Sequence, residues 1–182
     1  MMKWSGLILA LSLALTGCAT REAVFMPAAT QSADQPFAVS GRLSVNLDGK
    51  GHVANFDWRH QPERDQLAIN SPLGNTVAEV IRDAGGVTLL ADGKAWQAAD
   101  VESLTEKTLG WPLPLPLSGL AWWIRGMPVP GEASEVRPDG ELLQQGWRIR
   151  FVREAESGER YPKRVDLARD GLTVRVVTRD WR

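Results

Sequence analysis

Apolar and polar residues alternate along most of the chain from Phe37 onward. In FAVSGRLSVNL, residues 37–47, every second side chain is apolar over most of the segment, which is the period of a strand with one buried face. DGKG, residues 48–51, is a hairpin signal, and HVANFDW, residues 52–58, alternates in the same way. Further strands are predicted at residues 65–70, 76–82, 87–91, 94–98, 146–152, 164–169 and 172–181. The pattern indicates an antiparallel meander.

Two segments in the middle of the chain have helical spacing instead. Residues 100–110, DVESLTEKTLG, start with an N-cap residue type and end in glycine. The prolines of residues 112–116 exclude a helix and favour an extended segment. Residues 117–125 can form a short helix ended by Gly126, with an apolar face of Leu120, Trp123 and Ile124.

The predicted fold class is therefore all-β with a helical insertion. Strands that alternate strictly bury one face only, so something must cover the apolar side. Either the sheet curls round on itself or the central helices lie across its mouth. Both arrangements would enclose apolar volume, and a ligand cavity is possible.

The first residues resemble an export signal. Lys3 precedes an apolar run, residues 4–15, of about a dozen residues, which is shorter than the roughly 20 needed for a membrane span. The run ends in LTGC, which resembles the lipobox of bacterial lipoproteins and makes Cys18 the expected lipidated residue. An ordinary signal peptide with an incidental cysteine, or a signal anchor, is the alternative.

Three parts of the chain are expected from this start. Residues 1–17 would be the lipoprotein signal peptide, and residues 18–36, rich in Ala, Thr, Ser and Pro, a lipid-anchored flexible tether. Residues 37–182 would form one folded domain. Ala19 and Thr20 follow the cysteine. By the sorting rule of enterobacterial lipoproteins, in which an Asp next to the cysteine favours retention in the inner membrane, its absence here implies the outer membrane, with the body facing the periplasm.

Composition removes several function classes. The net charge of −1 and pI near 6.1 argue against a nucleic-acid partner. Two histidines and one cysteine provide no candidate metal cluster, and no cofactor motif is present. We expect His52 and His60 to be exposed polar residues. Asp57 and Asp65 could in principle act as an acid–base pair, but the sequence does not show whether the two side chains lie close together. An enzyme is not expected.

Eight tryptophans in 182 residues are unusual. Most are expected to fill the core, although some could line a cavity or meet lipid. Trp122 and Trp123 point about 100° apart on a helix, so at least one of them is expected to leave the core.

The turn SPLG, residues 71–74, places a leucine where turns normally carry Gly, Pro, Asn, Asp or Ser. From the residues alone, Leu73 could fold back onto its own strands, because isolated apolar surface residues are common. That interpretation is favoured over the alternative, in which the leucine is held out as a probe for a membrane.

Several motifs occur in the order that is typical of the LolB family. They are the lipobox ending at Cys18, GRLSV (41–45), FDW (56–58), NSPLGNT (70–76), the helix from Asp100 leading to LG, PLSGLAWWIRGMP (116–128), PKRVDL (162–167) and VRVVTRDW (174–181). The resemblance spans nearly all of the chain after the signal. The LPLPL segment is longer than the linker usual in that family.

The resemblance implies an unclosed antiparallel β-barrel covered by a short-helix lid, enclosing an apolar cavity. It implies a monomeric, non-enzymatic receptor that accepts lipoproteins from the soluble periplasmic carrier LolA and releases them into the outer-membrane lipid. Cys18 would carry the lipid, and Pro72, Leu73 and Gly74 would form the membrane-insertion loop. The acyl chains of client lipoproteins would lie against Phe56, Trp58, Leu67, Ile69, Leu120, Ile124, Trp147 and Ile149.

Other classes of protein stay open at this point. A lipid-anchored assembly or scaffold protein would hold no lipid cargo. A soluble carrier of related fold would lack the lipid anchor. An envelope hydrolase would lose activity when Asp57, His52 or His60 is replaced.

Overall fold

A computed structural model of the protein describes residues 22–24, 34–109, 116–154 and 160–182. The signal segment, Cys18, Pro112 and Pro114 lie outside these ranges. The strands are β1 (Glu22–Val24), β2 (Phe37–Leu47), β3 (Lys50–Gln61), β4 (Arg64–Asn70), β5 (Thr76–Asp83), β6 (Gly86–Ala91), β7 (Lys94–Ala98), β8 (Ser134–Val136), β9 (Leu142–Gln144), β10 (Trp147–Glu154), β11 (Arg164–Arg169) and β12 (Leu172–Trp181). The helices are α1 (Val101–Leu109) and α2 (Leu117–Trp123).

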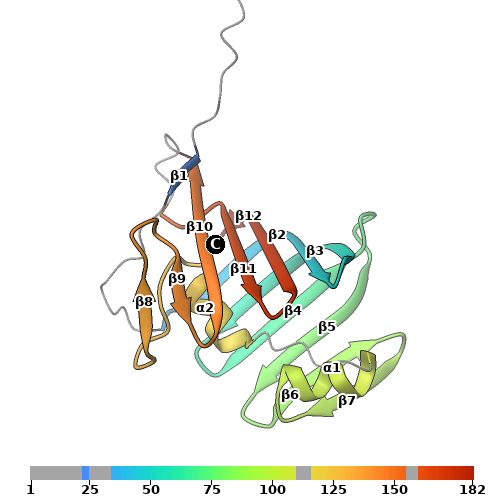
Figure 1. Cartoon of the computed structure of the whole chain (residues 1–182). Coiled ribbons are helices and arrows are strands. Elements are labelled where there is room, and N and C mark those ends of the chain that lie inside the picture. The colour runs from blue at the N-terminus through green and yellow to red at the C-terminus, as the bar shows by residue number, and fades with distance from the viewer. Residues whose placement is uncertain (1–21, 25–33, 110–115, 155–159) are drawn as a thin grey trace, which may run out of the picture.

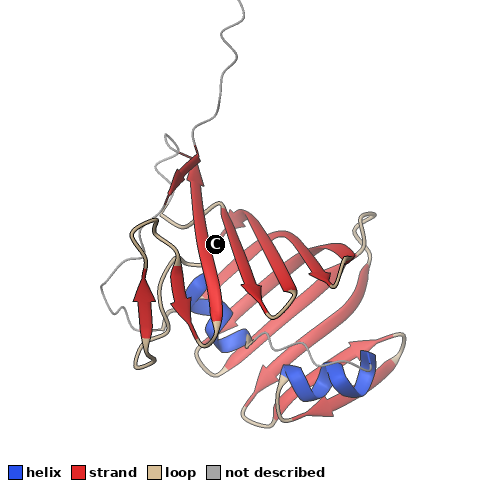
Figure 2. Cartoon of the chain, viewed as in Figure 1, coloured by secondary structure: helices blue, strands red, loops and turns tan. Residues whose placement is uncertain are grey.

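All strands belong to one antiparallel sheet that curls without closing (Figure 1). The strand order is β7-β6-β5-β4-β3-β2-β12-β11-β10-β9-β8, and β1 pairs with the end of β10. Within the described ranges, β7 and β8 are therefore the two free ends. Figure 2 shows α2 inside the curve of the sheet and α1 against β6 and β7. The predicted class, an unclosed antiparallel barrel with short helices on its open side, is confirmed.

The alternation of side chains fixes which residues face inward. On β2 and β3, Phe37, Val39, Phe56 and Trp58 are buried, whereas their neighbours along each strand are more exposed. The inner faces of the central strands and α2 form one apolar cluster. Its members on β10, β11 and β12 are Trp147, Ile149, Phe151, Val165, Leu167, Leu172, Val174 and Val176.

Helix α2 is buried at every residue except Ser118. Trp123 is fully buried and donates its indole N–H to Gln144 Oε1 at 2.9 Å. Trp122 is only 9 % exposed, with the Arg125 guanidinium 4.6 Å from its ring centroid. The expectation that one of these two tryptophans leaves the core is wrong, because the curled sheet and the chain after the helix surround α2. Gly126, at φ 77°, ends the helix region as predicted.

Helix α1 confirms the predicted N-cap. The Ser103 backbone N–H donates to Asp100 Oδ1 at 2.7 Å, and this bond holds the pKa of the Asp100 carboxyl below its usual range. Leu104 is the buried residue through which α1 covers the β6–β7 end of the sheet. Neither helix in the described part of the chain is long and apolar enough to cross a membrane.

Three short strands, β1, β8 and β9, were not predicted. Each has three residues, too few to display a period-two pattern. Strand β1 differs from the expectation of a tether without strand pairing, because Glu22–Val24 pairs with Val152–Glu154 of β10. The rest of residues 18–33 lies outside the described ranges.

Candidate functional site

The loop between β4 and β5 holds Leu73 away from the body. Leu73 is 90 % exposed, more than any other exposed large apolar side chain of the described residues. The Ser71 N–H donates to Asn75 O at 2.8 Å, and the Gly74 N–H donates to Ser71 O at 2.9 Å. Gly74 has φ 89°, which favours glycine. The loop is thus a closed backbone turn in which Leu73 does not fold back onto its strands.

The base of this loop is fixed to the neighbouring strands. Asn70, 9 % exposed, donates its amide to Asp57 Oδ2 at 2.8 Å. Its amide oxygen accepts a hydrogen bond from Thr76 Oγ1 at 2.9 Å. One side chain therefore joins β3, β4 and the start of β5, and the direction of the loop is set by the barrel.

The eight residues predicted to line a cavity divide into two groups. Six are buried in the common cluster with α2, namely Phe56, Trp58, Leu120, Ile124, Trp147 and Ile149. Leu67 and Ile69 on β4 are only half-buried at the edge of that cluster. In this conformation the first group forms protein core, and the second group packs against the edge of that core while staying partly exposed.

A row of apolar side chains continues from β4 toward the free end of the sheet. Register pairs Trp58 with Leu67, Leu67 with Val80, Val80 with Leu89 and Leu89 with Trp96. Leu67, Val80, Leu89 and Trp96 are half-buried. We call these four residues the concave row. Val80 and Leu89 were not predicted as site residues, although the alternation in residues 76–82 and 87–91 puts them on this face.

The opposite end of the barrel, away from Leu73, contains a buried polar cluster. His60 is 2 % exposed, so the expectation that it is an exposed polar residue is wrong; His52 is exposed. His60 Nδ1 lies 2.6 Å from Asp65 Oδ1, and Trp58 Nε1 donates to the same oxygen at 2.9 Å. Asp65 also accepts a hydrogen bond from Arg82.

The same cluster joins the end of the lid region to the start of the domain. His60 Nε2 lies 3.0 Å from Asp34 Oδ1, and Arg125 donates to that oxygen at 2.8 Å. Arg125 is 3 % exposed and also donates to Ala121 O of α2 at 2.8 Å. Asp57, bonded to Asn70 near the loop, is not part of this cluster, so Asp57 and Asp65 do not form an acid–base pair.

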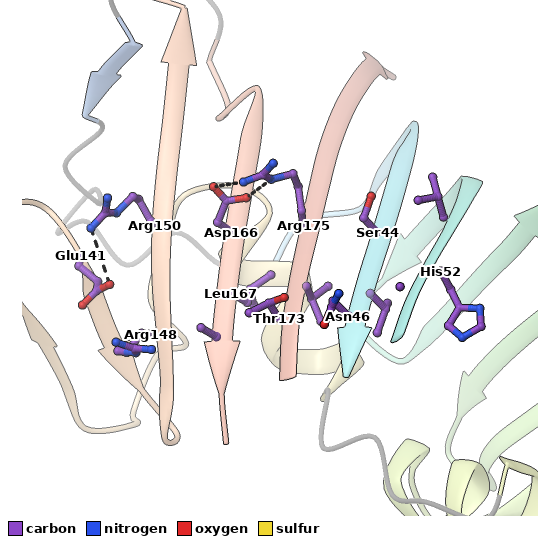
Figure 3. Close-up of a pocket in the computed structure, with 15 residues that line it drawn as sticks. Ser44, Asn46, His52, Glu141, Arg148, Arg150, Asp166, Leu167, Thr173 and Arg175 are labelled. Carbon is purple, nitrogen blue, oxygen red and sulfur yellow. Dashed lines mark hydrogen bonds and ion pairs between the residues drawn. The ribbon is translucent and has the colours of Figure 1, made fainter. Parts of the chain in front are cut away.

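The convex face carries a groove of about 640 Å³ that crosses β3, β2, β12, β11 and β10 and has both polar and apolar lining residues. Figure 3 shows its floor of polar side chains. Arg175 donates to both carboxylate oxygens of Asp166, at 2.6 and 3.4 Å. Arg150 lies 4.0 Å from Glu141 Oε1. Arg148 is exposed, and no ion pair joins it to another described residue. The residues that line this groove were not predicted as a site.

Fold and surface together define a class: an unclosed antiparallel barrel with a helix against its concave face and a leucine held out at one end. The model of a family described as outer membrane lipoprotein LolB matches residues 35–181. A LolB from Chromobacterium violaceum is 66 % identical over 96 % of this chain and 97 % of its own. A LolB from Neisseria meningitidis is 36 % identical over 91 % of this chain and 84 % of its own. A LolA superfamily protein from Nitrosomonas europaea has 10 % identity and a TM-score of 0.47, covering 84 % of this chain and 87 % of its own.

The chain belongs to the LolB family of outer-membrane lipoproteins. The resemblance seen in the motifs is thereby confirmed. Membership supports a location in the outer membrane and a role in lipoprotein localisation.

Proposed function

We propose that this protein accepts acylated lipoproteins from the periplasmic carrier LolA on its concave face and inserts them into the outer membrane. The observation that carries the proposal is the concave row, a line of half-buried apolar side chains on β4 to β7 in a member of the LolB family. Cys18 would anchor the protein by lipid, with the body on the periplasmic side and acting as a monomer.

The hydrophobic effect is sufficient to drive such a transfer. Each CH₂ of an acyl chain exposed to water costs about 0.8 kcal/mol, so a free chain cannot cross the periplasm unprotected. Passing the chain between two apolar surfaces placed together avoids that cost. Direction requires only tighter binding here than on the carrier, and tighter binding still in the bilayer. No covalent step is part of this proposal.

The acyl chain would first contact the concave row and not the residues beneath α2. Leu67 and Val80 are half-buried, whereas Trp58, the next residue of the same line, is 2 % exposed and hydrogen-bonded to Asp65. Displacing α2 would expose six or more buried apolar residues at once, each worth about 1.5–3 kcal/mol. The part of the face that α2 does not cover therefore offers the lower-cost site.

Leu73 would act at the second step, when the cargo leaves for the membrane. One leucine contributes about 1.5–3 kcal/mol when buried in lipid, which is too weak to anchor the protein. It is enough to orient a barrel already held near the bilayer by the lipid on Cys18. The braced base formed by Asn70 keeps the loop direction constant during that contact.

The test is a transfer assay from loaded LolA with two variants that should fail at different steps. Val80→Glu should lower acceptance of cargo at least about tenfold, because a carboxylate in the concave row costs several kcal/mol when an acyl chain covers it. Leu73→Glu should accept cargo normally but stall its insertion into outer-membrane vesicles.

Val177→Glu is the matched control, because Val177 is also half-buried but lies on the convex side, paired with Arg42 and Arg164. It should behave as the wild type in both steps. A scaffold protein without lipid cargo is the second candidate. Failure of the wild-type protein to take cargo from LolA, or normal acceptance by Val80→Glu, would favour that candidate.

A further inference from the structure

Exposed large apolar side chains are concentrated around one loop. In the described ranges they are Val53, 58 % exposed, Leu73, 90 %, Val77, 51 %, Leu90, 37 %, and Val136, 42 %. All but Val136, which lies on β8, belong to β3, β5, β6 or the loop between β4 and β5. Scattered apolar residues need no explanation, but a cluster on one side of a monomer does.

Register brings Val77 and Leu90 close to each other and places Val53 and Leu73 at the same end of the sheet. The last β3–β4 pair is Asn55 with Asn70, so Val53 lies two residues farther along β3, beside the chain that leads into the loop. Val77 follows the first residue of β5, directly after the loop. Leu90 pairs with Glu79, two residues along β5 from Val77. We call Val53, Leu73, Val77 and Leu90 the rim patch.

Two grooves extend the rim patch on either side. Val77 and Leu90 line a groove of about 360 Å³ over β5 to β7. Val53 lines the larger groove of Figure 3, which continues to Arg148 on β10. The larger groove contains three arginines against one aspartate and one glutamate, so it has one excess positive charge. Asp92 and Lys94 in the smaller groove carry opposite charges.

We propose that the rim patch and the arginine groove form one membrane-binding face, in which the four aliphatic side chains enter the lipid surface and Arg148 binds a phosphate of an anionic phospholipid. The inference rests on the proposed function, since it names how the loop end meets the bilayer. In this proposal the contact with the membrane is not limited to Leu73 of the loop. It also includes side chains on three strands, β3, β5 and β6, and a binding site for a lipid headgroup at Arg148.

The chemistry of the face matches a lipid surface. Aliphatic side chains beside cationic ones are the combination that binds the headgroup and acyl boundary of a bilayer. The carboxylates in the groove are already near arginines: Asp166 binds Arg175, and Glu141 lies near Arg150 and binds Arg137. The exposed guanidinium of Arg148 can donate hydrogen bonds to an anion from outside the protein. The planar arrangement of its N–H groups matches the geometry of phosphate oxygens.

The experiment measures partitioning of the mature chain carrying Cys18→Ala, without cargo, onto vesicles of phosphatidylethanolamine and phosphatidylglycerol. The combined variant Val53→Ser, Val77→Ser, Leu90→Ser retains Leu73 and should bind at least about tenfold more weakly. Arg148→Gln should weaken binding to these vesicles several-fold and leave binding to neutral phosphatidylcholine vesicles unchanged. Thermal unfolding checks that each variant is folded.

Val136→Ser is the matched control, since Val136 is comparably exposed but lies on β8, outside the rim patch. It should bind vesicles as the wild type does. Wild-type binding by the triple variant overturns the proposal, as does equal weakening by Val136→Ser. A triple variant that binds vesicles normally but accepts cargo poorly from LolA would also overturn it, by making the patch a protein-docking surface.

Failure of this inference and failure of the proposed function give different results. Vesicle binding without cargo does not depend on the concave row, so Val80→Glu should partition like the wild type. If the protein never accepts cargo, the vesicle assay still decides on the membrane face. If cargo is accepted and inserted normally by the triple variant, the proposed function stands and the membrane face does not.

Discussion

Asp65 is the residue on which the buried polar cluster depends. Its side chain is fully buried and lies within bonding distance of His60, Trp58 and Arg82. Removing one member of a buried ion pair leaves the other charges without compensation, which costs about 3–5 kcal/mol. The cluster also holds Arg125 through His60 and Asp34, so its loss would loosen the region after α2.

Replacing Asp65 by asparagine should therefore lower the free energy of unfolding by about 3 kcal/mol or more. Asp166→Asn is the control: Asp166 also binds arginines, Arg175 and Arg164, but it is 26 % exposed where Asp65 is fully buried, and surface ion pairs contribute about 0–1 kcal/mol. Urea unfolding of the non-lipidated protein measures both. Similar losses for the two variants would contradict a special role for the buried cluster.

The exposure of single residues could be predicted from the sequence only in part. The exposure of Leu73 was inferred from the resemblance of its motif to the LolB family, since the residues alone favoured a leucine folded back onto its strands. The burial of His60 could not be inferred, because Asp34 lies 26 residues before His60 in the chain, and no periodic pattern records such a contact. The predicted exposure of His60 followed from residue type alone, and burial of a histidine depends on partners that only the fold provides.

At the scale of elements, the pairing of β2 with its two neighbours requires a glycine at position 41. A Cβ on Gly41 would lie 2.1 Å from Val177 O of β12 and 2.9 Å from the Phe56 ring of β3. Gly51, also in a strand, has only Asn46 Nδ2 at 3.6 Å from such a Cβ. The two glycines thus form a matched pair with different surroundings.

Gly41→Ala should destabilise the fold by about 1–3 kcal/mol, because β2 must move away from β12 or Phe56 must repack. Gly51→Ala should be neutral within about 0.5 kcal/mol. Thermal unfolding of both variants tests the difference. A Gly41→Ala protein as stable as the wild type would mean that the strands separate at no cost.

Elements with a regular pattern were predicted well and short ones were not. Strands β2, β7, β11 and β12 have the predicted bounds, since each shows alternation between clear turns. Strands β8 and β9 were not predicted, because a segment of three residues is too short to show a period-two pattern. The sequence could not separate the predicted cavity residues that are buried in the core from those that stay half-buried. Alternation shows that Trp58 and Leu67 share a face, but it does not show that Trp58 is more fully covered than Leu67.

At the scale of the whole molecule, the two ends of the barrel differ in structure. Asp34, where the described domain begins, binds the polar cluster near the end of β3, whereas Leu73 follows the other end of β4. The seven residues of β4 span about 23 Å at roughly 3.3 Å each. The segment from Cys18 to Asp34 must cover at least this distance if the rim patch is to reach the bilayer.

When fully extended, that segment is long enough to cover this distance. Sixteen peptide units separate Cys18 from Asp34, which gives about 53 Å at roughly 3.3 Å each, provided that β1 releases its three pairs with β10.

Deleting residues 20–31 leaves about four units, or about 13 Å, which is shorter than β4. The deletion should therefore abolish insertion of cargo in lipidated protein while acceptance from LolA continues. Replacing residues 20–31 by Gly and Ser at equal length should preserve insertion, because flexible chains of that composition have comparable reach. Normal insertion by the deletion variant would mean that the barrel meets the membrane by another face.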